Sequence, residues 1–135
     1  MILLDLSGNM ITSMSIRSLV KDGKLLSLKQ LLLNGNSIDA EACSFLVEGK
    51  WKHLEELKLN FNSIGNEGLH NLVPHKWNRM KQLHLLHTNI GNNGIVGLVS
   101  MNMPLLQKLF LSNNHITDDG CKVLAKGQWR HLKTL

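Results

Sequence analysis

Hydrophobic residues recur along the chain at a fixed spacing. The pattern Leu-x-x-Leu-x-Leu-x-x-Asn-x-Ile begins without substitution at Leu28, Leu54 and Leu106. A first copy begins at Met1 and a fourth at Met80, and a cut-short copy opens at residue 132. First positions therefore stand at residues 1, 28, 54, 80, 106 and 132, which gives a period of 27 residues once and 26 residues thereafter. Such self-similarity predicts a repeat architecture.

Each copy predicts one short strand and one short helix. The Leu-x-Leu alternation is typical of a strand with one buried face. Five residues after each Ile stands Ile, Leu or Cys, and eight residues after it stands Leu, which together predict one face of a short helix. A unit of this size cannot bury its apolar side alone, so the units must stack into a solenoid with strands inside and helices outside.

These residues resemble the leucine-rich repeat family over the whole chain. The resemblance implies a right-handed α/β horseshoe with parallel strands on its concave face and short helices on its convex face. The period and the segments GNEG and TDDG are most similar to the ribonuclease-inhibitor and cysteine-containing subtypes, although Asn stands where the latter has Cys. We predict one domain, residues 1–135, with repeats 1–27, 28–53, 54–79, 80–105, 106–131 and a partial sixth, 132–135.

Residues that recur at the same position of each repeat predict how the coils join. The Asn of each copy is expected to donate to and accept from the backbone of adjacent coils, and Thr88 should interrupt that ladder and weaken its coil. Gly49 and Gly127 stand where a helix C-terminus favours a residue that tolerates positive φ, and Gly23 does so one residue later. Pro74 marks another helix end.

The tryptophans and cysteines have structural interpretations. Trp51, Trp77 and Trp129 each stand three residues before the next repeat, where Leu or Met fills the same position in other copies. We interpret them as core residues rather than as a stacking ladder for bases or sugars. Cys43 and Cys121 share one repeat position three coils apart, too far for a disulfide, so we expect both to be buried thiols in a reducing compartment.

No motif indicates catalysis or a cofactor. The chain lacks a phosphate-binding glycine loop, a His-Glu-x-x-His helix and a Cys-x-x-Cys pair, so we predict a non-enzyme without cofactor. We interpret residues 91–94 as a turn. His84, His87 and His115 come nearest to a metal cluster, but we expect no carboxylate or Cys to join them.

The outward positions around Leu-x-Leu predict a partner-binding patch on the concave face. They combine apolar residues, expected to be exposed, with polar and ionisable neighbours, as protein interfaces do. The predicted partner-binding residues are Leu32, Lys58, Phe61, His84, Leu86, His87 and Phe110. The alternative is a scatter of exposed hydrophobic side chains, or side chains covered by neighbouring molecules.

Composition and charge add a second candidate surface. Hydrophobic residues make up 43% of the chain and charged residues 19%, which is typical of a folded protein, and the formal net charge is +5. Basic residues gather near the tryptophan position and predict a basic edge: Lys50, Lys52, Lys76, Arg79, Lys126 and Arg130. It could meet nucleic acid or another anionic surface, but a solvated rim is the simpler interpretation.

We therefore predict a protein–protein interaction module that presents its concave surface to a protein partner. The alternatives are a sensor or substrate-recruiting segment of a larger ligase, receptor or bacterial effector, and a binder of nucleic acid through the basic edge. Without a signal peptide or a membrane-length apolar run, we expect an intracellular, cytoplasmic location. Neither end shows a polar cap, so we expect a fragment of a longer array or association end to end.

Overall fold

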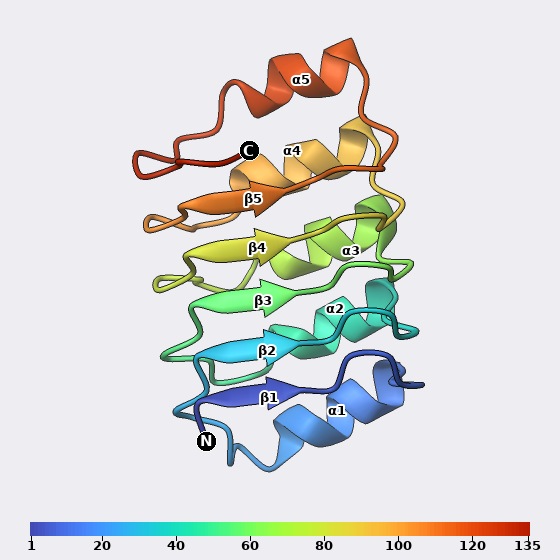
Figure 1. Ribbon diagram of the computed structural model, residues 1–135, viewed down its shortest axis with the longest axis vertical. Coiled ribbons are helices and arrows are strands. Elements are labelled where there is room, and N and C mark those ends of the chain that lie inside the picture. The colour runs from blue at the N-terminus through green and yellow to red at the C-terminus, as the bar shows by residue number, and fades with distance from the viewer.

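The computed structural model describes residues 1–135 as five strands that alternate with five helices. The strands are β1 (Leu3–Asp5), β2 (Gln30–Leu32), β3 (Glu56–Lys58), β4 (Gln82–His84) and β5 (Lys108–Phe110). The helices are α1 (Ser13–Lys21), α2 (Ala40–Leu46), α3 (Gly65–Leu72), α4 (Asn92–Ser100) and α5 (Asp118–Leu124). Figure 1 shows the two resulting layers, with the strands stacked in one and the helices in the other. The predicted strand-and-helix solenoid is confirmed.

The strands form one parallel sheet in the order β1-β2-β3-β4-β5. The middle leucine of each strand pairs with the middle leucine of the next, from Leu31 with Leu57 to Leu83 with Leu109. These leucines are fully buried, whereas the residues on either side of them in β2 and β4 are half-buried. Equivalent positions of successive coils therefore lie in continuous rows across the sheet.

A single hydrophobic core fills the space between the sheet and the helices. In the inner coils the repeat leucines meet the predicted helix residues, such as Leu69 and Ile95, and all of these are fully buried. In the outer coils the matching residues Leu4 and Leu124 are only half-buried, because one side of each outer coil has no neighbour in the chain. Burial of this kind is the main stabilising term of a solenoid.

The predicted asparagine ladder joins the turns that follow the strands. The Asn62 amide donates to the carbonyls of Leu33 and Leu59 at 2.8 and 3.0 Å, and its Oδ1 accepts from the backbone of Asn36 and Ile38. Asn36 and Asn114 repeat this arrangement in their own coils.

Thr88 interrupts the ladder, as the sequence predicts. Its hydroxyl donates to the Leu85 carbonyl of its own coil at 2.7 Å, but it does not reach the Leu59 carbonyl of the coil before. The side chain is fully buried. Whether its coil is weaker stays a prediction.

The tryptophans pack between the end of one helix and the start of the next strand. Their rings, and not positive φ, account for the glycines at positions 49 and 127. Trp51 and Trp77 are buried, and their indole N–H groups donate to the carbonyls that end α2 and α3, at 2.6 and 2.9 Å. The prediction of positive φ is confirmed for Gly23 but wrong for Gly49 and Gly127. A Cβ at Gly49 would lie 2.1 Å from the Trp51 ring, so the close approach of the indole requires this glycine.

Two further expectations need correction. Cys43 is buried, but Cys121 is exposed because α5 is covered by only one neighbouring helix of the chain. Both cysteines are free. Residues 91–94 begin a helix and do not form a separate turn, since Gly91 is the N-cap of α4 and the next three residues form its first turn.

Candidate functional site

A row of four side chains crosses the concave face, where the strands lie. Leu32 pairs with Lys58, Lys58 with His84, and His84 with Phe110, so the row passes without a gap from β2 to β5. The His84 and Phe110 rings stack with centroids 4.5 Å apart and an interplanar angle of 28°. The sheet register therefore brings together four of the predicted partner-binding residues.

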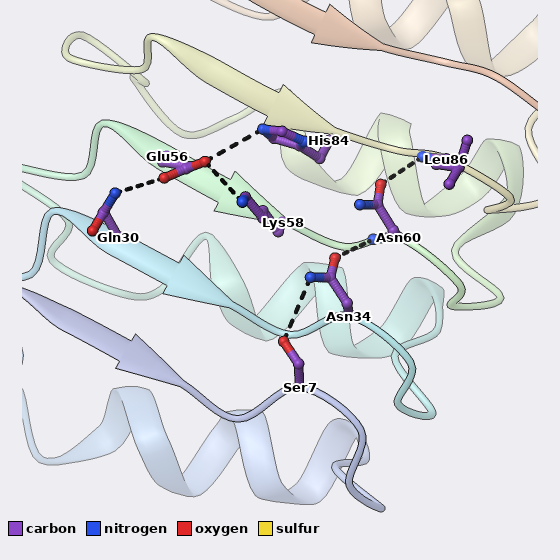
Figure 2. A network of polar contacts seen from close by, with 8 residues as sticks. All are labelled: Ser7, Gln30, Asn34, Glu56, Lys58, Asn60, His84 and Leu86. Atoms are coloured by element: carbon purple, nitrogen blue, oxygen red, sulfur yellow. Dashed lines mark hydrogen bonds and ion pairs between the residues drawn. The ribbon is translucent and has the colours of Figure 1, made fainter.

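Glu56 lies beside this row, and sequence reasoning missed it. It occupies the first position of β3 and is only 7% exposed. Gln30 Nε2 donates to Glu56 Oε2 at 2.7 Å, while Lys58 Nζ and His84 Nε2 lie 3.3 and 3.4 Å from Oε1. Figure 2 shows Glu56 between the Gln30 amide on one side and Lys58 and His84 on the other. These contacts compensate the carboxylate for the water that it loses.

The surroundings of His84 favour its neutral form. Burial lowers the pKa of His84, and the Lys58 charge lowers it further, whereas Glu56 opposes both effects. Its buried Nε2 makes no hydrogen bond. The sequence expectation considered only carboxylates at matching strand positions, and it did not foresee that Glu56, which pairs with Gln82, would lie 3.4 Å from His84. No three His, Cys, Asp or Glu side chains gather into a metal-binding group.

The other predicted residues form a second group, where the strands turn toward the helices. Phe61 is 54% exposed, and its ring lies 5.6 Å from the ring of His87, which is also exposed. Leu32, Leu86 and Phe110 were also expected to be exposed, but each is half-buried. Ring stacking explains this for Phe110, because the His84 ring covers it. Of the apolar residues predicted for this patch, only Phe61 is exposed.

Polar links between coils fix the backbone below these groups. The Asn34 side chain accepts from the Asn60 backbone at 3.0 Å, and the Asn60 side chain accepts from the Leu86 backbone at 2.8 Å. Figure 2 shows this second line of contacts, which starts at Ser7 in the first coil. The face is therefore held in place before any partner arrives, which lowers the entropic cost of binding.

A hollow of about 510 Å³ opens beside Phe61 and His87, at the turns that follow β3 to β5. We call it the turn hollow. Its lining is polar apart from one aromatic ring, and it contains no Asp, Glu, Lys or Arg. The lining residues are Asn36, Phe61, Asn62, Ser63, His87, Asn89, Asn113 and His115.

Comparison with known proteins identifies a repeat family and similar solved structures. A family model described as Leucine Rich repeat matches residues 52–73 and 102–125. No curated protein matches the sequence. Among solved structures, the chain is similar to an internalin from Listeria monocytogenes, with a TM-score of 0.46 and 19% sequence identity. The alignment covers 99% of this chain and 47% of the internalin chain, so this chain spans about half of that length.

The matched segments coincide with whole coils of the structure. Residues 52–73 contain β3 and α3, and residues 102–125 contain β5 and α5. In both segments a strand of the parallel sheet is followed by its helix. Two coils of the solenoid match the leucine-rich-repeat model, and all five coils have the same strand-and-helix form. None of the five helices in this solenoid has the length and apolar character needed to cross a bilayer.

The basic edge of the solenoid lies in the segments that follow α2, α3 and α5. All six predicted residues of this edge are exposed, from Lys50 to Arg130. Lys50, Lys52 and Lys76 line an open hollow of about 430 Å³ beside Trp51.

The helix dipoles offer a structural reason for this charge distribution. Acidic residues stand in the first turns of α2, α3 and α5. The basic turns come after the helix C-termini, so each sign of charge faces the helix end that it stabilises. The basic edge therefore needs no nucleic acid to explain it.

Proposed function

We propose that the chain is a non-enzymatic module that binds a protein partner on its concave face. The observation that carries this proposal is the unbroken row from Leu32 to Phe110 together with the adjacent Phe61 and His87. An exposed aromatic anchor with ionisable and half-buried apolar neighbours is typical of the energetic centre of a protein interface.

The composition of the row suggests how such a partner would be recognised. Lys58 retains 30% of its side-chain exposure beside Glu56, so it can still donate outward. His84 and Phe110 offer a flat stacked surface next to it. Apolar contact would supply affinity here, while the fixed amine would select the orientation of the partner.

Two finer assignments belong to the same proposal. The regular helix in each of the five coils supports a ribonuclease-inhibitor-like subtype, and the offset of 26 residues between paired leucines supports the predicted repeat bounds. A cytoplasmic location is also part of the proposal, and the two free cysteines support it.

A pull-down from an extract of the source cells tests the proposal. The bait is the wild-type chain, compared with the quadruple variant Lys58→Ala/Phe61→Ala/His84→Ala/Phe110→Ala. We expect a partner protein that the wild type retains and the quadruple variant loses. Circular dichroism must show that the variant keeps its fold.

The matched control changes the basic edge instead, with Lys50→Ala/Lys52→Ala/Lys76→Ala. This variant should retain the partner, because these lysines lie in turns outside the sheet. A partner that survives the quadruple change and is lost with the lysines would reject the concave face. Steep weakening by salt would then indicate an anionic partner.

A further inference from the structure

One backbone conformation recurs in every coil, directly before the ladder position. The residue there has a positive φ of 67°, 59°, 56°, 52° and 56° from the first coil to the fifth. The residues are Gly8, Gly35, Phe61, His87 and Asn113. The solenoid therefore imposes this left-handed conformation whatever residue is present.

Three coils meet this requirement at low cost, and two do not. Glycine adopts positive φ without strain, and Asn is the side chain that tolerates it best. Phe61 is bulky and lacks this tolerance, whereas His87 tolerates positive φ less well than glycine, and a left-handed residue with a Cβ costs about 1–2 kcal/mol. Their tilted ring pair returns only about 0.5–1.5 kcal/mol. The fold alone would be better served by glycine at both positions.

The strained residues converge on one place. Every residue other than glycine with a positive φ lines the turn hollow, and these are Phe61, His87, Asn89 and Asn113. Strain that clusters around one concavity and is avoidable elsewhere in the same fold points to a binding role. It distinguishes this hollow from the hollow beside Trp51, which has no such residue.

The free groups of the turn hollow define the chemistry of its ligand. The Ser63 hydroxyl, the His87 imidazole and the Asn113 amide make no hydrogen bond within the chain, and they surround the half-exposed Phe61 ring. The absence of Asp, Glu, Lys and Arg from the lining favours a neutral ligand. Such a ligand needs several hydrogen-bonding groups and an apolar face that can lie on an aromatic ring.

The backbone around the hollow argues against an extended peptide. Peptides in extended form are usually held by main-chain hydrogen bonds along a free strand edge. Here the amides of Phe61 and His87 already donate to the next coil, at 2.9 and 3.0 Å. The side chains of the hollow supply the remaining contacts, and their amide, imidazole and hydroxyl groups match the vicinal hydroxyls of a sugar.

We infer that the turn hollow binds a neutral carbohydrate, as a free sugar or as the end of a glycan. The hollow has room for a mono- or disaccharide. Phe61 lies against the C–H face of the sugar ring, while Ser63, His87 and Asn113 bind its hydroxyls. The hollow shares Phe61 and His87 with the proposed partner surface, but it contains none of the four row residues, so a sugar can bind there without the protein partner.

NMR titration of the ¹⁵N-labelled chain tests this inference. The probes are glucose, galactose, mannose and N-acetylglucosamine with their neutral disaccharides, and glucuronic acid and glucosamine serve as charged comparisons. At least one neutral sugar should shift the amide signals of Phe61, Ser63, His87 and Asn113, and the charged sugars should bind more weakly. Methyl glycosides separate the two sources, because binding that requires the free anomeric hydroxyl indicates a free sugar.

The decisive variant is Phe61→Gly, which gives the third coil the residue that the second coil has. It should weaken sugar binding by at least about tenfold and raise the melting temperature, since it removes both the stacking ring and the strain. The control Lys58→Ala, on the strand outside the hollow, should leave sugar binding unchanged.

Three results would overturn the inference. They are the lack of any neutral sugar that shifts the signals of the hollow, equal binding by Phe61→Gly, and equal binding of charged sugars. A lower melting temperature for Phe61→Gly would also overturn it, because the ring would then serve the fold. These results leave the partner pull-down undecided, because three of its four changed residues, Lys58, His84 and Phe110, lie outside the hollow.

Discussion

A carboxylate that loses most of its water needs compensating contacts, and Glu56 obtains them from three different strands. Gln30 of β2 donates to it, while Lys58 of β3 and His84 of β4 lie at ion-pair distance. The contacts act in both directions, since Glu56 also fixes the position of two side chains proposed to meet the partner. A site whose side chains are held in this way is preorganised for binding.

Two half-buried histidines predict a dependence of stability on pH. Burial lowers the pKa of His75, with a hydrogen bond to the Val47 carbonyl opposing it, and burial followed by the Lys58 charge lowers the pKa of His84. Because both folded values lie below the ordinary value of 6.5, the unfolded chain takes up protons first as the pH falls. The stability that the two neutral histidines contribute is complete above pH 6.5. It is lost as the pH falls through their pKa values in the folded chain.

Urea unfolding at about pH 7.5 and about pH 5.5 measures the effect. The wild type should have a lower midpoint at the lower pH, and His75→Gln/His84→Gln should lose less of its stability between the two values. An equal loss in wild type and variant would show that other groups cause the dependence. Lys81 holds the pKa of Glu55 below its ordinary 4.5, so that carboxylate titrates outside this window.

At the scale of the element, each coil depends on how its helix passes into the next strand. The Trp51 indole fills this junction and caps the Leu46 carbonyl at the end of α2. Gly49 leaves the space that the ring occupies. The pair Gly49 and Trp51 therefore acts as one device that ends the helix and seals the core.

Gly49→Ala should destabilise the chain by about 1–3 kcal/mol, because the new methyl group would displace the indole. The control is Gly91→Ala, where the nearest atom outside the chain neighbours would be 3.6 Å from the added Cβ. Urea unfolding of both variants tests the difference. An equal loss of stability in both variants would mean that backbone flexibility, and not contact with the tryptophan, is the reason for glycine at position 49.

The sequence was sufficient for the elements but not for all contacts between them. Spacing alone placed the strands, the helices and the buried role of Trp51 and Trp77, since these follow from period and hydrophobicity. The sequence did not reveal the burial of Glu56, because it depends on side chains of neighbouring coils, Gln30 before it and His84 after it. Gly49 was predicted for positive φ, but the close Trp51 ring requires it instead. The spacing of glycines in the sequence cannot distinguish these two causes.

For the candidate site, the sequence predicted which side chains lie in one row but not how deeply each is buried. The row from Leu32 to Phe110 follows directly from the repeat register. Half-burial of Phe110 does not, because it depends on the rotamer by which His84 stacks on it. The role of Phe61 and His87 in binding stays a prediction.

Across the whole molecule, the asparagine ladder is the polar counterpart of the apolar core. It links the turn of each coil to the next, and Thr88 is its one gap between Asn62 and Asn114. There the backbone amides of Asn62 and Ile64 lack the side-chain acceptor that equivalent amides have in other coils. The gap divides the ladder into an N-terminal and a C-terminal part.

Thr88→Asn should close this gap and stabilise the chain by about 1–2 kcal/mol, because it restores buried hydrogen bonds at nearly constant volume. The reverse change, Asn62→Thr, should open a second gap and lower stability by a similar or larger amount. Thermal unfolding followed by circular dichroism measures both. A Thr88→Asn chain that melts below the wild type would show that its coil has adapted its packing to threonine.

The shared register also bears on how such a face can change during evolution. Loss of residues 54–79 by an in-frame deletion would place the strand of Leu32 beside that of His84 with the leucine column intact. Duplication of a coding segment of this length would move the flanking side chains apart by one strand spacing, about 4.8 Å. Unequal recombination between neighbouring coils therefore yields chains that fold by the same contacts but present a new order of side chains.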